Sequence, residues 1–230
     1  MEISQNRKQM IDELTSTILN SRNNTQPYIV GISGVDTSGK SRLTDELESK
    51  LLELNYDVQV IHIDDFHNPK RIRYNTAFPE PEQYYNLSIN FQELIDEILI
   101  PIKNNNELSI VLSHLDLSKD EFTKSKEYKV CKDTIVLLEG VFLYRKELSQ
   151  FLDFFIYLEI DESTMLDRAK MRDVPTQGEE VIRKYDEKYI PAQKKYIHTY
   201  QPKQNANIVI DNNCISNPII KYKPISKKEY

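Results

Sequence analysis

Gly34-Val35-Asp36-Thr37-Ser38-Gly39-Lys40-Ser41 is the stretch of sequence that decides the fold. It matches the pattern GxxxxGK followed by Ser or Thr, and it lies between an apolar run at 28–33 and leucines at helical spacing over 40–54. Glycines let such a strand-to-helix loop wrap around phosphates, and successive N–H groups and the helix N-terminus supply positive potential. This loop, together with Arg42, is the candidate nucleotide-binding segment. Lys40 would reach the β- and γ-phosphates of ATP, and the Ser41 hydroxyl would ligate Mg²⁺.

Outward from this loop, predicted strands alternate with predicted helices. Apolar runs predict strands at 28–33, 58–63, 108–112, 134–138, 154–160 and 208–210. Helical spacing predicts helices at 3–20, 40–54, 91–99, 162–172 and 179–199. We expect the third helix to stop before Pro101, a break at 174–178, and a loop over 64–87. The alternation predicts a three-layer α/β fold of the P-loop NTPase type, with a parallel central sheet flanked by helices.

Length and composition limit the function classes. A chain of 230 residues predicts one domain over 1–230, with an N-terminal helical segment at 1–26. A net charge of −6 argues against a general nucleic-acid binder. No apolar run approaches the roughly 18 residues that span a bilayer, and the first 20 residues do not resemble a signal peptide. Cys131 and Cys214 have no metal-site or disulfide pattern, so we expect a cytoplasmic protein without a membrane partner.

The rest of the sequence indicates which class of nucleotide-binding protein this is. A GTPase would need a guanine-reading NKxD element, which is absent, and a motor or large ATPase would need a longer chain. A small-molecule kinase needs an acid near the γ-phosphate, a further carboxylate for the metal, and mobile arginines. The sequence has candidates for all three.

The candidate acids follow two predicted strands. Asp64 and Asp65 come after the strand at 58–63, at the carboxyl edge where open α/β sheets bind ligands. Either one could orient the acceptor hydroxyl and help hold Mg²⁺, although a pair of turn-forming aspartates is the alternative. Glu139 ends the strand at 134–138, where a carboxylate could serve the metal or its water shell.

The candidate arginines lie in a segment that we interpret as a short helical lid, residues 164–185. Arg168 and Arg172 are four residues apart, so they share a face of the predicted helix, just before the break at 174–178. This position suits a lid that closes over the phosphates, and Arg183 is a weaker candidate. A solvated basic helix face is the alternative interpretation.

Several of these stretches together resemble one family. GISGVDTSGKS, HIDDFHNP, LLEGVFL, DRAKMRD, YIPAQKKYI and NIVIDN are similar to the uridine kinase and phosphoribulokinase group of P-loop kinases, and most of all to its uridine kinase-like branch. The resemblance spans roughly residues 28–212.

The resemblance implies roles for individual residues. Asp64, the first acid of the DDF motif, would be the catalytic base, and Ser41, Asp64 and Glu139 would surround Mg²⁺. Lys40, Arg168 and Arg172 would stabilise charge on the transferring phosphoryl group. Candidate acceptor-binding residues are Asp65, His67, Arg71, Arg73, Tyr74 and His114, with Asp116 in the same segment as His114.

The predicted function is therefore ATP-dependent transfer of the γ-phosphoryl group to a hydroxyl of a small, nucleoside-like acceptor such as uridine or cytidine. The alternatives are a kinase for another small metabolite, such as pantothenate, nicotinamide riboside, a sugar or a sugar acid, and a regulatory protein that binds ATP without catalysis. The sequence does not decide between a monomer and a homo-oligomer.

Overall fold

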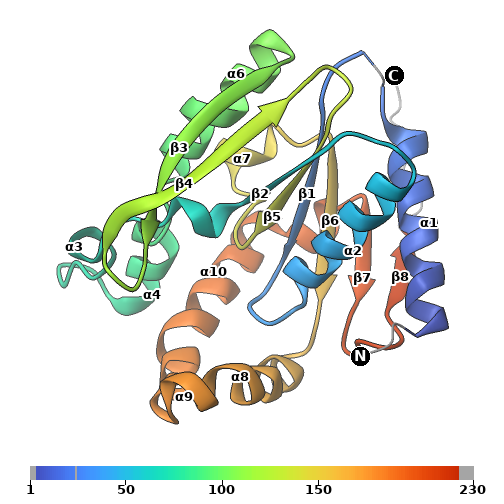
Figure 1. Cartoon of the computed structure of the whole chain (residues 1–230). Helices are drawn as coiled ribbons and strands as arrows, with labels where there is room; N and C mark the ends of the chain where they lie inside the picture. The colour runs from blue at the N-terminus through green and yellow to red at the C-terminus, as the bar shows by residue number, and fades with distance from the viewer. Residues whose placement is uncertain (1–3, 24, 223–230) are drawn as a thin grey trace.

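The central element of the computed structural model, which describes residues 4–23 and 25–222, is a six-stranded sheet with the order β2-β5-β1-β6-β7-β8 (Figure 1). Five of these strands run parallel, and β8 pairs antiparallel with β7 at one edge. Their bounds are Tyr28–Gly34 for β1, Val58–His62 for β2, Ile135–Gly140 for β5, Phe154–Glu159 for β6, Ile208–Asp211 for β7 and Ile219–Tyr222 for β8. The predicted parallel α/β sheet is confirmed, and β8 is a strand that the sequence pattern did not predict.

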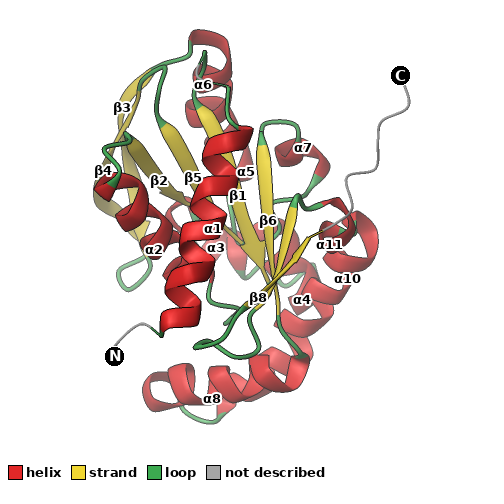
Figure 2. Cartoon of the chain, turned by 90° about the vertical axis from the view of Figure 1, so that its right-hand side faces the viewer, coloured by secondary structure: helices red, strands yellow, loops and turns green. Residues whose placement is uncertain are grey.

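Helices cover both faces of the sheet. One face carries α1 (Gln5–Ser21) and α2 (Lys40–Glu53), which lie in front of the strands in Figure 2. The opposite face carries α5 (Phe91–Leu94), the π-helix η3 (Ile95–Leu99), α6 (Ile100–Asn105) and α10 (Ile190–Tyr200). The predicted helix at 3–20 is α1, although Ile3 lies outside the described residues.

Successive side chains of each strand point to opposite faces of the sheet, so the core has two layers. In β1, Ile29 packs under α5, α6 and α10, whereas Val30 and Ile32 pack under α1 and α2. The same alternation places Leu138 and Leu137 of β5 on opposite faces. Continuous apolar runs in the sequence therefore reflect strands that are buried on both sides.

Two proline-based expectations were wrong. The helix that we expected to stop before Pro101 continues without a break from α5 through η3 into α6, and the π-helical turn that precedes Pro101 accommodates the proline. The break expected at 174–178 begins only at Gly178, because α8 (Glu162–Gln177) continues through Pro175. This helix ends at Gly178, whose φ of 78° lies in the left-handed region.

The polar middle of the chain contains more regular structure than the sequence predicts. The strand expected at 108–112 is β3 (Leu108–Asp116), and it pairs antiparallel with β4 (Glu121–Val130) in a hairpin outside the main sheet. Periodicity did not reveal β4, because most of its side chains are exposed on both faces. The expected loop at 64–87 holds four short helices: η1 (Ile63–Phe66), α3 (Lys70–Arg73), α4 (Glu80–Glu82) and η2 (Gln83–Leu87).

The helices α8 and α9 (Glu180–Lys184) form the lower part of Figure 1. After them, the chain forms the π-helix η4 (Tyr185–Tyr189), which leads into α10. The other two short helices are α7 (Lys146–Ser149) and α11 (Pro202–Asn205). Across residues 4–23 and 25–222, every helix is too short or too polar to cross a lipid bilayer.

The carboxyl end of β5 packs tightly against the start of η1. A Cβ at Gly140 would lie 2.0 Å from Cγ1 of Ile63, and Ile63 is fully buried. We therefore expect Gly140→Ala to lower the free energy of unfolding by about 1–3 kcal/mol, measured by urea denaturation. In an Ile63→Ala background the same change should cost much less. An equal cost in both backgrounds would contradict this explanation.

Candidate active site

A cleft of about 230 Å³ lies at the carboxyl ends of β1, β2 and β5. Ligands of open α/β sheets bind at this edge. Its lining residues come from the phosphate loop, η1, η2, β5 and the α8–α9–η4 segment. They are Asp36, Thr37, Lys40, Ser41, Asp64, His67, Tyr84, Ile89, Glu139, Gly140, Val141, Arg172, Asp173, Gln177, Val181, Tyr185 and Tyr189. A larger groove of about 390 Å³ between α1 and α2 is lined mainly by charged side chains and includes no part of this cleft.

The phosphate loop turns sharply between β1 and α2. Gly39 has a φ of 93° and immediately precedes α2, so it occupies the left-handed region that favours glycine. Inside the loop, the N–H of Ser38 donates to the carbonyl of Val35 at 3.2 Å. The Nζ atom of Lys40 donates to the same carbonyl at 3.0 Å. Lys40 and Ser41 both line the cleft, as a phosphate- and metal-binding loop requires.

Asp36 of the loop is held from two other elements. Tyr84 on η2 donates to its Oδ2 at 3.0 Å, and Gln193 on α10 donates to the same atom at 2.6 Å. The backbone N–H of Asp36 donates in turn to Oε1 of Gln193 at 3.3 Å. Burial raises the pKa of the Asp36 carboxyl above its ordinary value. The network ties the tip of the loop to both walls of the cleft.

The two neighbouring acids after β2 point in different directions. Asp64 lines the cleft, whereas Asp65 pairs with Nζ of Lys126 on β4 at 2.8 Å. Successive side chains on a 3₁₀-helix project about 120° apart, so η1 separates the two carboxylates. Of this pair, only Asp64 lines the cleft that the phosphate loop borders.

Glu139 reaches the cleft because β5 lies between β1 and β2. Its partner in the parallel register is His62, and a hydrogen bond of 2.7 Å joins Nδ1 of His62 to Oε2 of Glu139. This bond raises the pKa of His62 above its ordinary value, against the opposing effect of burial. Glu139 is 6% exposed, and its carboxylate is hydrogen-bonded to His62.

Three oxygen-bearing side chains could share a divalent cation at this edge. Ser41, Asp64 and Glu139 all line the one cleft. In the described part of the chain, no group of three or more His, Cys, Asp or Glu side chains is suited to hold a metal by itself. This donor set fits Mg²⁺, which takes one or two carboxylates and completes its shell with water and substrate phosphates.

The two arginines predicted for the lid have different surroundings. Arg172 lines the cleft and forms a two-pronged ion pair with Asp173, Nε to Oδ1 at 2.7 Å and Nη2 to Oδ2 at 2.9 Å. Tyr185 donates to the same carboxylate at 2.8 Å. Arg168 lies outside the cleft lining. Its guanidinium donates to the carbonyl of Thr37 in the phosphate loop at 3.2 Å, and to the carbonyls of Asn212 and Asn213 at 2.6 and 3.1 Å.

Arg183 and Arg42 lie away from the cleft. Arg183 is exposed and pairs with Glu180 and Glu187 on its own helical segment. Arg42, which we included in the nucleotide-binding segment, donates to Oε1 of Glu46 at 3.0 Å within α2.

The structure brings only one of the remaining acceptor candidates to the cleft. His67 lines it and donates from Nδ1 to the carbonyl of Asp64 at 2.6 Å. Arg71 is exposed, and Arg73 donates to the carbonyl of Asn68 at 2.6 Å. Tyr74 lines a separate cavity of about 250 Å³. His114 is 4% exposed, and its Nε2 is joined to the Tyr128 hydroxyl at 2.8 Å.

Residues that sequence reasoning did not assign to the site also line or support the cleft. They are His62, Tyr84, Asp173, Tyr185, Tyr189 and Gln193. The position of His62 follows from the pairing of β2 with β5, which periodicity does not reveal. Asp173 directly follows Arg172, so its presence beside a predicted phosphate-binding arginine was the one available signal.

The Asp173 cluster predicts a pH dependence of stability. The pair with Arg172 holds the pKa of the Asp173 carboxyl below its ordinary value, so its stabilising effect is present above the unfolded pKa of about 3.9 and is lost as pH falls through the lower folded pKa. We expect Asp173→Asn to unfold at a lower Tm than the wild type at pH 7, and the difference to shrink as the pH falls below about 4. The control is Asp186→Asn, at an exposed carboxylate of η4. A difference in Tm that is constant with pH would contradict the ion-pair explanation.

Comparisons with known proteins show what this chain is similar to. The family model described as "Phosphoribulokinase / Uridine kinase family" matches residues 29–215. Uridine-cytidine kinase B from Dictyostelium discoideum is 26% identical over 204 residues, which cover 83% of this chain and 77% of that protein. A uridine kinase from Chlamydia pneumoniae is 26% identical over 199 residues, or 83% of this chain and 84% of that protein. Among solved structures, a possible uridine kinase from Bacillus stearothermophilus has 27% identity and a TM-score of 0.73, and the match covers 88% of this chain and 97% of that one.

Proposed function

Because this chain belongs to the phosphoribulokinase / uridine kinase family, we propose that it phosphorylates a hydroxyl of uridine or cytidine with ATP and Mg²⁺. It is a phosphotransferase that acts on a hydroxyl group. The observation that carries the proposal is that Asp64 lines the same cleft as Lys40 and Ser41. A protein that only bound nucleotide would not need an acid on the acceptor side of the phosphates.

The phosphate loop would bind the triphosphate of ATP. Its N–H groups and the N-terminus of α2 favour negative charge, and Lys40 adds a mobile ammonium group. Ser41, Asp64 and Glu139 would hold Mg²⁺, which when bound neutralises charge that develops on the phosphate oxygens. His62 orients Glu139 through their hydrogen bond.

Asp64 would accept or orient the proton of the acceptor hydroxyl. The hydroxyl oxygen then attacks the γ-phosphorus, and the bond from that phosphorus to the bridging oxygen of ADP breaks. Lys40 and Arg172 line the cleft on the phosphate side, where they would stabilise the charge on the transferring group. Most of the rate enhancement would come from positioning and electrostatics.

Residues 164–185 would act as a lid within a single kinase domain. Met165, Ala169 and Val181 are buried in a small core that also includes Ile190 of α10 and packs against Val35 of the phosphate loop. In this proposal α8 and α9 move together about that contact, which would bring Arg172 closer to the phosphates and exclude water. Arg168 binds loop carbonyls, so its role in this proposal is to shape the phosphate loop.

A panel of acceptors tests the identity of the substrate. With Mg·ATP present, we expect uridine or cytidine to stimulate ADP release at least tenfold more than pantothenate, nicotinamide riboside, sugars or sugar acids do. EDTA should remove the stimulation, because the proposed cation site depends on Mg²⁺. A stronger response to one of the other compounds would reassign the acceptor, and no response to any of them would favour a regulatory nucleotide-binding protein.

The separation of Asp64 from Asp65 gives a matched pair of variants. We expect Asp64→Asn to lower kcat by at least tenfold while Mg·ATP still binds, because an amide cannot accept the hydroxyl proton. Asp65→Asn removes a pair with Lys126 outside the cleft, so it should reduce kcat much less. Steady-state kinetics and calorimetry on both variants make the measurement. The reverse order of effects would move the base to Asp65.

A further inference from the structure

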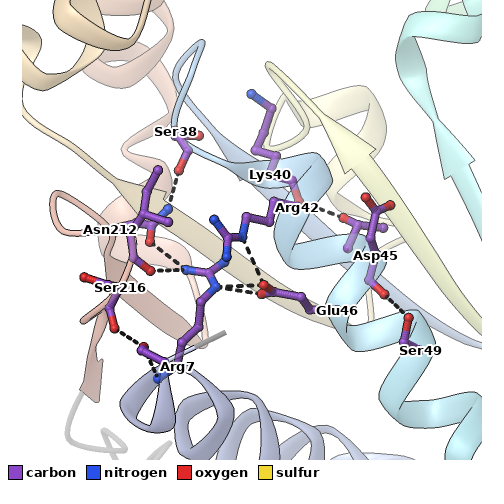
Figure 3. A network of polar contacts seen from close by, with 12 residues as sticks. Arg7, Ser38, Lys40, Arg42, Asp45, Glu46, Ser49, Asn212 and Ser216 are labelled. Atoms are coloured by element: carbon purple, nitrogen blue, oxygen red, sulfur yellow. Dashed lines mark hydrogen bonds and ion pairs between the residues drawn. The ribbon is translucent and has the colours of Figure 1, made fainter. Parts of the chain in front are cut away.

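A buried arginine on α1, outside the region that the family model matches, contacts a residue that is hydrogen-bonded to the phosphate loop (Figure 3). Arg7 lies near the start of α1, and its side chain is 1% exposed. Its Nε donates to both carboxylate oxygens of Glu46 on α2, at 2.8 and 2.9 Å. Its Nη1 donates to Oδ1 of Asn212 at 3.2 Å and to the carbonyl of Ile215 at 2.9 Å. This arginine therefore joins α1 to α2 and to the turn after β7.

Arg7 dictates which way the Asn212 amide faces. A guanidinium has only donors, so the atom of Asn212 that faces it must be the oxygen. The amide nitrogen then faces the phosphate loop, where Nδ2 donates to the carbonyl of Ser38 at 2.7 Å. Asn212 is itself 1% exposed, and its backbone N–H donates to the carbonyl of Glu159 at 2.9 Å. If the Asn212 amide were reversed, its oxygen would face the carbonyl oxygen of Ser38, and its N–H groups would face the N–H groups of Arg7.

The Ser38 carbonyl controls the direction of one loop amide. The Ser38–Gly39 peptide is planar and trans, so its C=O and N–H point in opposite directions. Holding the carbonyl against Asn212 therefore directs the N–H of Gly39 away from Asn212. The approach is close, because a Cβ at Gly39 would lie 2.7 Å from Nδ2 of Asn212.

We propose that Arg7 is a positioning residue for nucleotide binding, which acts through Asn212 on the Ser38–Gly39 peptide of the phosphate loop. The inference rests on the proposed function in one respect, that this loop binds the phosphates of ATP. It adds that a helix outside the matched region preorganises the loop. Glu46 holds Arg7 in place, and Arg42 shares that carboxylate.

The same helix offers a matched control. Asn6 donates to Oδ1 of Asn217 at 2.8 Å, so it also ties α1 to the turn after β7. This contact is exposed and does not extend to Asn212 or to the phosphate loop. Its removal loosens the helix without changing the Ser38–Gly39 peptide.

The test compares Arg7→Lys, Asn212→Ser, their double variant and Asn6→Ala in the full chain. Lysine keeps the charge but lacks the planar fork that serves Glu46 and Asn212 together. Calorimetry gives the Kd for Mg·ATP, and steady-state kinetics give the KM for uridine, at a temperature where thermal scans show each variant folded. We expect Arg7→Lys and Asn212→Ser each to weaken Mg·ATP binding about tenfold, as the loss of one well-made hydrogen bond does. The double variant should be little weaker than either single variant.

Asn6→Ala should bind Mg·ATP within twofold of the wild type, and the KM for uridine should change less than twofold in all variants. Arg7→Lys with wild-type affinity and a lowered Tm would show a purely structural role and overturn the proposal. So would additive losses in the double variant. If Arg7→Lys does not fold, wild-type affinity in Asn212→Ser overturns it equally. A wild-type protein that binds no Mg·ATP would instead refute the proposed function, so the two failures are distinguishable.

Discussion

A loop that directs its N–H groups toward phosphates leaves carbonyl groups on its outer side, and these buried acceptors need donors. In this protein two of these donors come from distant parts of the chain. The carbonyl of Thr37 accepts from Arg168 at 3.2 Å, and that of Ser38 accepts from Asn212 at 2.7 Å. Much of the surrounding architecture supplies and orients these donors, including the turn after β7, the first half of α8 and the first turn of α1.

The insertion of β5 between β1 and β2 creates the rest of the site. It brings Glu139 beside His62 and close to the end of β1, although the two residues are 77 positions apart in the chain. The same arrangement leaves no room at Gly140 for a side chain, because Ile63 at the start of η1 packs against it. The tight packing fixes where η1 begins, and η1 in turn determines that Asp64 faces the cleft.

The cationic side chains around the loop divide into two groups. Arg7, Arg42 and Arg168 are held by carboxylates or carbonyls outside the cleft, where they support the loop. Lys40 and Arg172 line the cleft itself. Spacing on a helix predicts that Arg168 and Arg172 share a face, but one helical turn is enough to place one against the loop carbonyls and the other in the cleft.

Local sequence was sufficient for the parts of the protein that depend on neighbouring residues. The phosphate loop, the buried strands, the helices α1 and α2, and the acids that end β2 and β5 all follow from glycine placement, apolar periodicity and strand ends. Local sequence did not predict β4, the continuation of helices through Pro101 and Pro175, or the short helices over 64–87, because those depend on packing rather than on periodicity.

Which residues contact one another around the cleft and the phosphate loop was decided by tertiary structure alone. Tyr84 and Gln193 meet at Asp36, His62 meets Glu139, and Arg7 reaches the loop through Asn212. Each of these contacts depends on strand order and helix docking, which a one-dimensional pattern does not contain. A carboxylate or an arginine is visible in the sequence, but its hydrogen-bond partner is determined only when the sheet and its two helical layers come together.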